Sequence, residues 1–127
     1  MGSVSVFLLD SVILIDHLNG VQGARAFLTT ESLHSAISFV TYSEVIAGSS
    51  PKELQRVIPW LDSFPFLGID SATAKLAGLL RQEHRWKLPD AFQAALAMHH
   101  GLRLITRNTR DFPPAKYPFV QVPYGAP

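Results

Sequence analysis

The chain has 127 residues, 47% hydrophobic and 17% charged, a balance that excludes a disordered protein and predicts a single domain over residues 1–127. The formal net charge of +1 excludes a uniformly basic surface, so any nucleic acid must be bound by local clusters of Lys and Arg. Cysteine is absent from the sequence, which excludes disulfides, thiolate metal sites and cysteine nucleophiles and fits a cytoplasmic protein.

The first half of the chain is predicted to alternate between strands and helices. Residues 4–9 are an apolar run without polar alternation, typical of a strand covered on both faces and too short to span a membrane, so no membrane partner is expected. Ile13, Leu14 and Leu18 follow at helical spacing and predict a helix over residues 11–18. A helical turn, a strand and a helix are then expected at residues 24–28, 34–39 and 41–47.

The second half is predicted to contain three longer helices. Pro51 is suited to open a helix that runs to about Leu61, and Ser71 to cap one that runs to Glu83. The inward face of this second helix is expected to carry Ala72, Leu76, Leu79 and Leu80. An Ala-rich helix is expected over residues 89–100, ended by Gly101.

Short strands complete the predicted fold. Pro65 favours an edge position for a strand within residues 64–69, and further strands are expected at residues 103–106 and 119–122. This alternation of strands and helices predicts an α/β sandwich with a mostly parallel sheet.

Acidic residues follow the predicted strands and mark a candidate site. Asp10 comes directly after the first strand, Glu44 lies on the helix after the second, and Asp90 begins the Ala-rich helix. Asn108 and Asp111 lie in the loop after the strand at 103–106. Because the carboxyl ends of parallel strands share one edge, these side chains are expected to converge there. Clustered carboxylates repel one another unless a hard cation neutralises them, which predicts a Mg²⁺ or Mn²⁺ site with Glu44 positioned to orient or deprotonate water.

Each acidic residue also has a structural explanation that the sequence leaves open. Thr41 and Glu44 have the spacing of a helix capping box, and Asp90 complements the dipole of its helix. Asp10 has the position of a helix N-cap, and Asp111 that of a loop residue bonded to its own backbone.

Other polar residues are secondary candidates. The Ser11 hydroxyl lies next to Asp10 in sequence and is positioned to touch the ion or its water. Arg107 and Arg110 flank the last loop of the site and are candidates for binding RNA phosphates. The basic cluster at residues 81–87 is better explained as a solvated surface.

Four segments, in order, resemble the motifs of PIN-domain ribonucleases of the VapC type, the toxins of type II toxin–antitoxin pairs. Residues 8–16 resemble the family's opening strand and its Asp-Thr-Asn-Val-Leu-Ile-Asp turn, and residues 41–48 resemble the motif that carries its Glu. Residues 88–97 and 104–112 resemble the third and fourth motifs. The resemblance covers nearly the whole chain.

This resemblance implies a PIN-like α/β/α sandwich and Mg²⁺- or Mn²⁺-dependent endonucleolytic cleavage of RNA. Asp10 and Asp90 would be the most direct metal ligands, with Glu44 completing the acidic pocket and either Asp111 or Asn108 as the fourth member. It also implies a homodimer and a VapB-type antitoxin that blocks the site in a hetero-oligomer.

Two departures from the family pattern keep other functions open. Val12 replaces the usual Asn of the opening turn and removes a polar group that would hold that loop, and Asn108 stands where some relatives carry an acid. A catalytically silent PIN scaffold that binds RNA or an antitoxin is therefore the alternative hypothesis. A phosphoacceptor receiver domain is disfavoured, because the first strand is followed by no acidic pair and the strand ending at Thr106 by no Lys.

Overall fold

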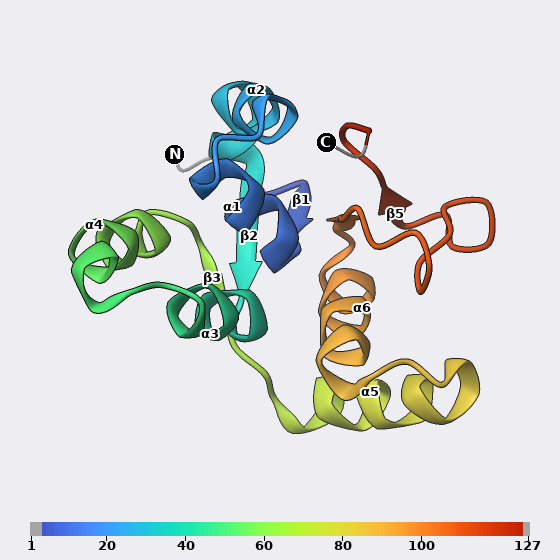
Figure 1. The fold of residues 1–127 in the computed structure, drawn as a ribbon. Coiled ribbons are helices and arrows are strands. Elements are labelled where there is room, and N and C mark those ends of the chain that lie inside the picture. The colour runs from blue at the N-terminus through green and yellow to red at the C-terminus, as the bar shows by residue number, and fades with distance from the viewer. Residues whose placement is uncertain (1–3, 126–127) are drawn as a thin grey trace.

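A parallel sheet of five short strands forms the centre of the computed structural model, which describes residues 4–125 (Figure 1). The strands lie in the order β3-β2-β1-β4-β5, and every neighbouring pair is parallel. Their bounds are β1 (Phe7–Leu9), β2 (Ser35–Ser38), β3 (Phe66–Leu67), β4 (Arg103–Ile105) and β5 (Val120–Gln121). The predicted parallel α/β architecture is confirmed, and the ends of the predicted domain, residues 1–3 and 126–127, lie outside the described residues.

Six helices within residues 4–125 flank the sheet. They are α1 (Ser11–Leu18), α2 (Gln22–Glu31), α3 (Phe39–Ala47), α4 (Pro51–Asp62), α5 (Ser71–His84) and α6 (Leu88–His100), with a short 3-10 turn η1 (Ser32–His34) before β2. Figure 1 shows α3 and α4 (green) on one side of the molecule and α5 and α6 (yellow to orange) on the other. None of the helices in residues 4–125 is both long enough and apolar enough to cross a membrane.

Alternate residues of the central strand supply two separate cores. Leu8 of β1 packs with α5 and α6, whereas Leu9 packs with α1, α3 and α4, and both side chains are fully buried. This two-sided burial explains why the strand lacks polar alternation. The predicted strand nevertheless began too early, since Val4 is 78% exposed and β1 begins at Phe7.

The edge prediction for β3 is confirmed, but the expected inward face of α5 was partly wrong. β3 pairs with β2 alone, and Phe66 is 54% exposed.

On α5 the buried residues are Thr73, Ala77 and Leu80, while Ala72 is exposed. Leu79, also expected to face inward, is exposed. Asp70, not Ser71, caps the helix, because its carboxylate accepts the backbone N–H of Thr73 at 2.8 Å. The side of α5 that meets the small residues of α6 therefore decided which face was buried.

Candidate active site at the carboxyl edge of the sheet

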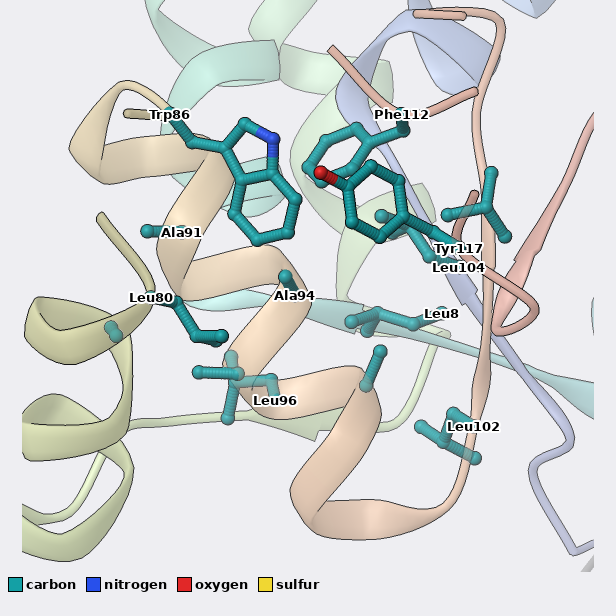
Figure 2. Close-up of a cluster of buried hydrophobic side chains, with 14 of the residues drawn as sticks. Leu8, Leu80, Trp86, Ala91, Ala94, Leu96, Leu102, Leu104, Phe112 and Tyr117 are labelled. Atoms are coloured by element: carbon teal, nitrogen blue, oxygen red, sulfur yellow. The ribbon is translucent and has the colours of Figure 1, made fainter. Parts of the chain in front are cut away.

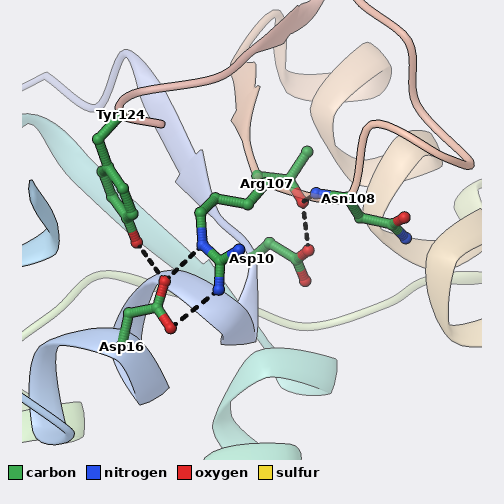
Figure 3. Close-up of polar contacts among 6 residues, drawn as sticks. Asp10, Asp16, Arg107, Asn108 and Tyr124 are labelled. Carbon is green, nitrogen blue, oxygen red and sulfur yellow. Dashed lines mark hydrogen bonds and ion pairs between the residues drawn. The ribbon is translucent and has the colours of Figure 1, made fainter. Parts of the chain in front are cut away.

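Asp10 lies where β1 passes into α1. Its backbone N–H donates to the Ile105 carbonyl at 2.9 Å, so the neighbouring strand β4 holds the turn in place. One carboxylate oxygen accepts the Ser11 N–H at 2.8 Å, and the other accepts the Thr106 hydroxyl at 2.6 Å (Figure 3). Burial raises the pKa of the Asp10 carboxyl, while hydrogen bonds, the largest from Thr106, act in the opposite direction. Asp10 is thus a helix cap that is also held from a second strand.

Glu44 reaches the same edge from the exposed face of α3. The Ser11 hydroxyl donates to Glu44 Oε1 at 3.0 Å, which joins the start of α1 to α3. The predicted capping box is wrong, because α3 begins at Phe39 and Ser38 caps it by accepting the Thr41 N–H at 3.2 Å. Glu44 therefore lies in the middle of the helix and is not used to satisfy its first turn.

Asp90 lies in the first turn of α6, and its carboxyl has a strongly raised pKa. Burial raises its pKa to about 6, and negative charges on neighbouring side chains add to the shift. The charges come from Asp10, Asp111 and Glu44, and the Lys87 ammonium acts in the opposite direction. Within residues 4–125 the Asp90 carboxylate takes part in no hydrogen bond or ion pair. A favourable helix dipole alone would lower this pKa, so the dipole explanation is insufficient.

The loop after β4 brings Asp111 into the same electrostatic field. Asn108 Nδ2 donates to Asp111 Oδ2 at 3.0 Å, and the Asp111 N–H donates back to Asn108 Oδ1 at 3.3 Å. The Asn108 N–H is bonded in turn to the Thr106 hydroxyl at 3.0 Å. Asn108 thus positions Asp111, and Asp111 contributes the negative charge that Asp90 experiences.

A buried polar network beneath these carboxylates was missed in the sequence. Gln93 Oε1 accepts the Ser38 hydroxyl at 2.7 Å, and Gln93 Nε2 donates to Thr41 Oγ1 at 2.7 Å. Thr41 donates onward to the Leu9 carbonyl at 2.9 Å, so the network joins α6, β2, α3 and β1. One signal was available, because Gln93 follows Asp90 by three residues and shares its helix face within an otherwise apolar stretch.

Arg107 has a different partner from the one expected. Its guanidinium binds both oxygens of the buried Asp16 carboxylate, at 2.6 and 3.0 Å, and the Tyr124 hydroxyl donates to the same carboxylate at 2.7 Å (Figure 3). The hydrogen bonds from Arg107, the largest cause, lower the pKa of Asp16. Because this pairing occupies two of the guanidinium nitrogens that a phosphate would need, Arg107 is not retained as an RNA-binding candidate.

Asp10, Glu44, Asp90 and Asp111, hereafter the carboxylate site, match a hard divalent cation by donor type and by charge. All four supply oxygen, the donor that Mg²⁺ and Mn²⁺ prefer. Burial first, and then the negative charges of the other three carboxylates, raise the pKa of Asp90. They do not form a closed ligand shell, since no three acidic, His or Cys side chains within residues 4–125 lie close enough to hold a metal. An ion held here would complete its ligand shell with water, as Mg²⁺ commonly does when one or two carboxylates bind it.

The predicted convergence at the sheet edge agrees with these contacts. Asp10 and Glu44 are bridged by Ser11, and all three remaining carboxylates contribute to the pKa of Asp90. The opening turn is held in place although Val12 supplies no polar group. Ser11 and Thr106 form its hydrogen bonds, and the Val12 side chain packs against the core that contains Leu9.

Comparison with known proteins identifies the family. The PIN domain family model matches residues 7–116, which include all four motifs in full. Ribonuclease VapC10 of Mycobacterium tuberculosis (strain CDC 1551 / Oshkosh) is 35% identical over 115 residues, covering 85% of this chain and 86% of the relative. Ribonuclease VapC19 of the same strain is 29% identical over 126 residues, covering 92% and 98%.

Solved structures agree with this result. A chain of a toxin-antitoxin complex from Klebsiella pneumoniae aligns with a TM-score of 0.85 and 40% identity, covering 94% of this chain and 98% of its own. A chain of DNA-bound VapBC from Salmonella typhimurium, at 24% identity and a TM-score of 0.75, covers 87% and 92% and supports the fold alone. With the model match and the VapC relatives taken together, this chain belongs to the PIN domain family and, within it, to the VapC group.

Proposed function

We propose that this chain is a divalent-metal-dependent endoribonuclease and the toxin of a type II toxin–antitoxin pair. The observation that carries the proposal is the uncompensated negative charge of the carboxylate site, expressed in the pKa of about 6 at Asp90. Carboxylates that only stabilise a fold are normally paired, as Asp16 is with Arg107. The ribonuclease names of the M. tuberculosis relatives supply the substrate class.

Asp10 and Asp90 are the proposed ligands of a Mg²⁺ or Mn²⁺ ion, because burial raises the pKa of both carboxyls and a bound cation would offset that cost. When bound, the ion would supply positive charge to the phosphodiester and lower the pKa of a bound water. Thr106 fixes one Asp10 oxygen at 2.6 Å and so orients the carboxylate. Asn108 does the same for Asp111.

Glu44 is the proposed acceptor of the proton of the attacking water. Its Oε1 is engaged by the Ser11 hydroxyl at 3.0 Å, and Oε2 has no partner among the described residues. As the water oxygen bonds to phosphorus and the P–O bond to the leaving sugar oxygen breaks, the water proton passes to Glu44 and a solvent proton neutralises the leaving oxygen. Ser11 is a positioning residue in this scheme.

The proposed partners are an RNA substrate, a VapB-type antitoxin and a second copy of the chain. The Klebsiella pneumoniae relative, 40% identical, comes from a toxin-antitoxin complex and supports the antitoxin. Size-exclusion chromatography with light scattering, on the chain alone and after co-expression with a VapB-type antitoxin, tests the homodimer and the hetero-oligomer separately.

The deciding experiment incubates antitoxin-free protein with a mixed pool of structured RNA and Mn²⁺. Parallel reactions contain EDTA, Asp90→Asn protein, or Asp62→Asn protein, in which an equal charge is removed from the exposed end of α4. Site-selective cutting by the parent chain and by Asp62→Asn, absent with EDTA and with Asp90→Asn, is the expected result.

A catalytically silent scaffold that binds RNA or an antitoxin is the second candidate. It is favoured by two departures from the family pattern, Val12 in the opening turn and Asn108 in the last motif. RNA that stays intact across Mg²⁺ and Mn²⁺, but is retained by the protein in a binding assay, would decide for this alternative.

A further inference from the structure

A polar pocket of about 200 Å³ adjoins the carboxylate site. It lies between the turn that joins α5 to α6 and the loop that follows β4, and one wall is Asp111. Its other principal residues, hereafter the basic pocket, are Arg85, Trp86, Arg110, Lys116 and Tyr117. Segments 25 residues apart in sequence are therefore joined into one surface next to the proposed catalytic centre.

Three cations surround this pocket and remain available to a ligand. Arg85, Arg110 and Lys116 are exposed, and within residues 4–125 none of them forms an ion pair with an acidic side chain. Arg81 from the same basic segment is used differently, because its guanidinium donates to the Trp86 carbonyl at 2.6 Å. The cluster at 81–87, expected to be a solvated surface, thus divides into a structural Arg81 and a pocket-lining Arg85.

The backbone at Arg85 is unusual for its residue type. Its φ of 61° lies in the left-handed region, where it ends α5, and it is the one non-glycine residue with positive φ in the described part of the chain. Gly or Asn usually occupies this helix-ending position because both tolerate it better. This conformation ends α5, with the Arg85 N–H bonded to the Arg81 carbonyl at 2.8 Å, and it fixes the backbone from which the Arg85 side chain lines the pocket.

An aromatic cluster holds the floor of the pocket rigid. Trp86 is 3% exposed and stacks on His84 with ring centroids 4.3 Å apart, and Tyr117 lies edge-on to Trp86 at 5.1 Å. Figure 2 shows Trp86, Tyr117 and Phe112 gathered beside α6. Trp86 Nε1 donates to the Asp111 carbonyl at 2.9 Å, so the floor is bonded to the loop of the carboxylate site. The backbone next to Arg85 is therefore tied to the loop that carries Arg110 and Asp111.

We propose that the basic pocket binds the phosphodiester backbone of RNA next to the bond to be cut. This inference rests on the proposed function for its position in a reaction, but the binding itself does not require cleavage. Guanidinium groups match phosphate oxygens bidentately, and an RNA strand cut at one phosphodiester carries further phosphates on either side. The pocket is smaller than the roughly 300–1,000 Å³ of sites for drug-sized ligands, which suits a stretch of backbone.

An acidic peptide is the competing ligand of similar charge, and the structure favours RNA over it. The lining of the pocket is mainly polar and charged, whereas peptide segments that dock in grooves are anchored by apolar side chains. Continuity with Asp111 also places a bound strand beside the carboxylates proposed to cut it.

The test measures binding separately from cleavage. A 5′-fluorescein-labelled single-stranded RNA is titrated with Asp90→Asn protein in EDTA, and its anisotropy is followed at several salt concentrations. The test variant adds Arg85→Gln and Arg110→Gln, and the matched control adds Lys52→Gln and Lys75→Gln, two exposed charges that do not line the pocket. Both pairs remove two positive charges, so a non-specific effect of net charge would be equal in the two proteins.

The arginine pair is expected to weaken RNA binding by at least about tenfold, with the control pair within about twofold. The slope of log K against log salt should become less steep by about 1.4, since each phosphate contact on a single strand contributes about 0.7. Circular dichroism melting of both variants establishes that they are folded. A poly-glutamate chain of equal length serves as competitor and should displace RNA poorly.

Several outcomes would overturn the inference: no RNA binding by the parent protein, equal losses in the two variants, or a poly-glutamate chain that competes as well as RNA. Failure of the proposed function has a different signature. If binding depends on Arg85 and Arg110 while no metal ion supports cleavage by the parent chain, the RNA site stands and the nuclease assignment falls.

Discussion

Asp16 and Asp90 have the same side chain in opposite environments. Asp16 is 6% exposed, and the Arg107 guanidinium and the Tyr124 hydroxyl bind its carboxylate and lower its pKa. Asp90 has no bonded partner among the described residues, and burial together with three neighbouring carboxylates raises its pKa to about 6. Groups of the protein neutralise the Asp16 carboxylate, whereas the described residues provide no bonded partner for the Asp90 carboxylate.

This difference separates an acid that the fold itself neutralises from one that has no bonded partner among residues 4–125. Asp16 ties α1 to the loop after β4 and to the segment after β5, because its partners come from both. That tie also holds the neighbouring Thr106, which bonds to Asp10. The structural cluster therefore supports the geometry of the carboxylate site while carrying none of its proposed chemistry.

The largest expected effect is that of Asp90→Asn on cleavage. Removal of a proposed metal ligand should lower the rate of RNA cleavage with Mn²⁺ by at least about 100-fold. The same change removes like-charge repulsion, so metal-free protein should gain about 1 kcal/mol in free energy of unfolding, a modest figure because Asp90 is only partly buried. Initial rates and urea unfolding in EDTA measure the two effects. If Asp90→Asn lost stability as well as activity, Asp90 would support the fold in the way proposed for Asp16.

Asp16→Asn should have the reverse profile. The Arg107 guanidinium would lose its charged partner, and we expect the free energy of unfolding to fall by about 2–3 kcal/mol. Tyr124→Phe removes one hydrogen bond to the same carboxylate and should cost about 1 kcal/mol. Urea unfolding in EDTA measures both changes. If Asp16→Asn were as stable as the parent chain, the Asp16–Arg107 ion pair would contribute nothing to stability, and Asp16 would not be a structural acid.

The stability of the metal-free protein should depend on pH in opposite directions through Asp90 and Asp16. The folded pKa of Asp90, about 6, lies above its ordinary value of 3.8, so its contribution to stability is complete below about pH 3.8 and is lost as pH rises through 6. Asp16 has a lowered pKa, and its contribution is lost only as pH falls below 3.8.

Between pH 4 and 7 the free energy of unfolding should therefore fall by about 1 kcal/mol in EDTA, after allowance for solvent screening at Asp90. Asp90→Asn should make this slope shallower. The slope should not disappear, because burial raises the pKa of Asp10 as well. Urea titrations at half-unit pH intervals provide the measurement. Burial lowers the pKa of His17, which makes stability rise with pH over the same range, so the deciding quantity is the difference between the parent chain and Asp90→Asn. A contribution of Asp90 that rose with pH in this difference would contradict its assignment as the uncompensated acid.

The smallest expected effect concerns Ser11. Ser11→Ala removes the hydroxyl that holds Glu44 at 3.0 Å, and cleavage should slow by about threefold to tenfold, with little change in stability at this exposed contact. Ser43→Ala, an exposed serine next to Glu44 on α3, is the matched control and should cleave at the parent rate. Equal rates in Ser11→Ala and the parent protein would mean that Glu44 needs no positioning.

Local patterns predicted the elements well where their physical cause was local. Pro51 begins α4 as expected, with Ser50 and Glu53 forming the capping box there, and Gly101 ends α6 with a φ of 65°. The acids that follow β1 and β4 were placed at the carboxyl edge because parallel strands share their direction. These inferences required only the order of residues along the chain.

Predictions failed where the cause was a partner distant in sequence. Glu44 matched a capping box by spacing, but a turn of helix beginning at Phe39 left it free for Ser11, which lies 33 residues away. Arg107 resembled a free phosphate-binding cation, but Asp16, 91 residues away, binds it. Spacing along the chain does not report which charges meet, since an ion pair depends only on distance in space.

Short segments of the sequence were enough to predict the alternation of strands and helices, the family motifs and a site with oxygen donors only. Hydrophobic periodicity, turn residues and donor type are all properties of such segments. Tertiary structure alone decided which acids stay uncompensated, that Asn108 positions Asp111, and that Arg85 and Arg110 share one pocket. The reason is physical: burial and charge compensation are sums over all neighbours in three dimensions, and packing of the two cores against the sheet chooses those neighbours.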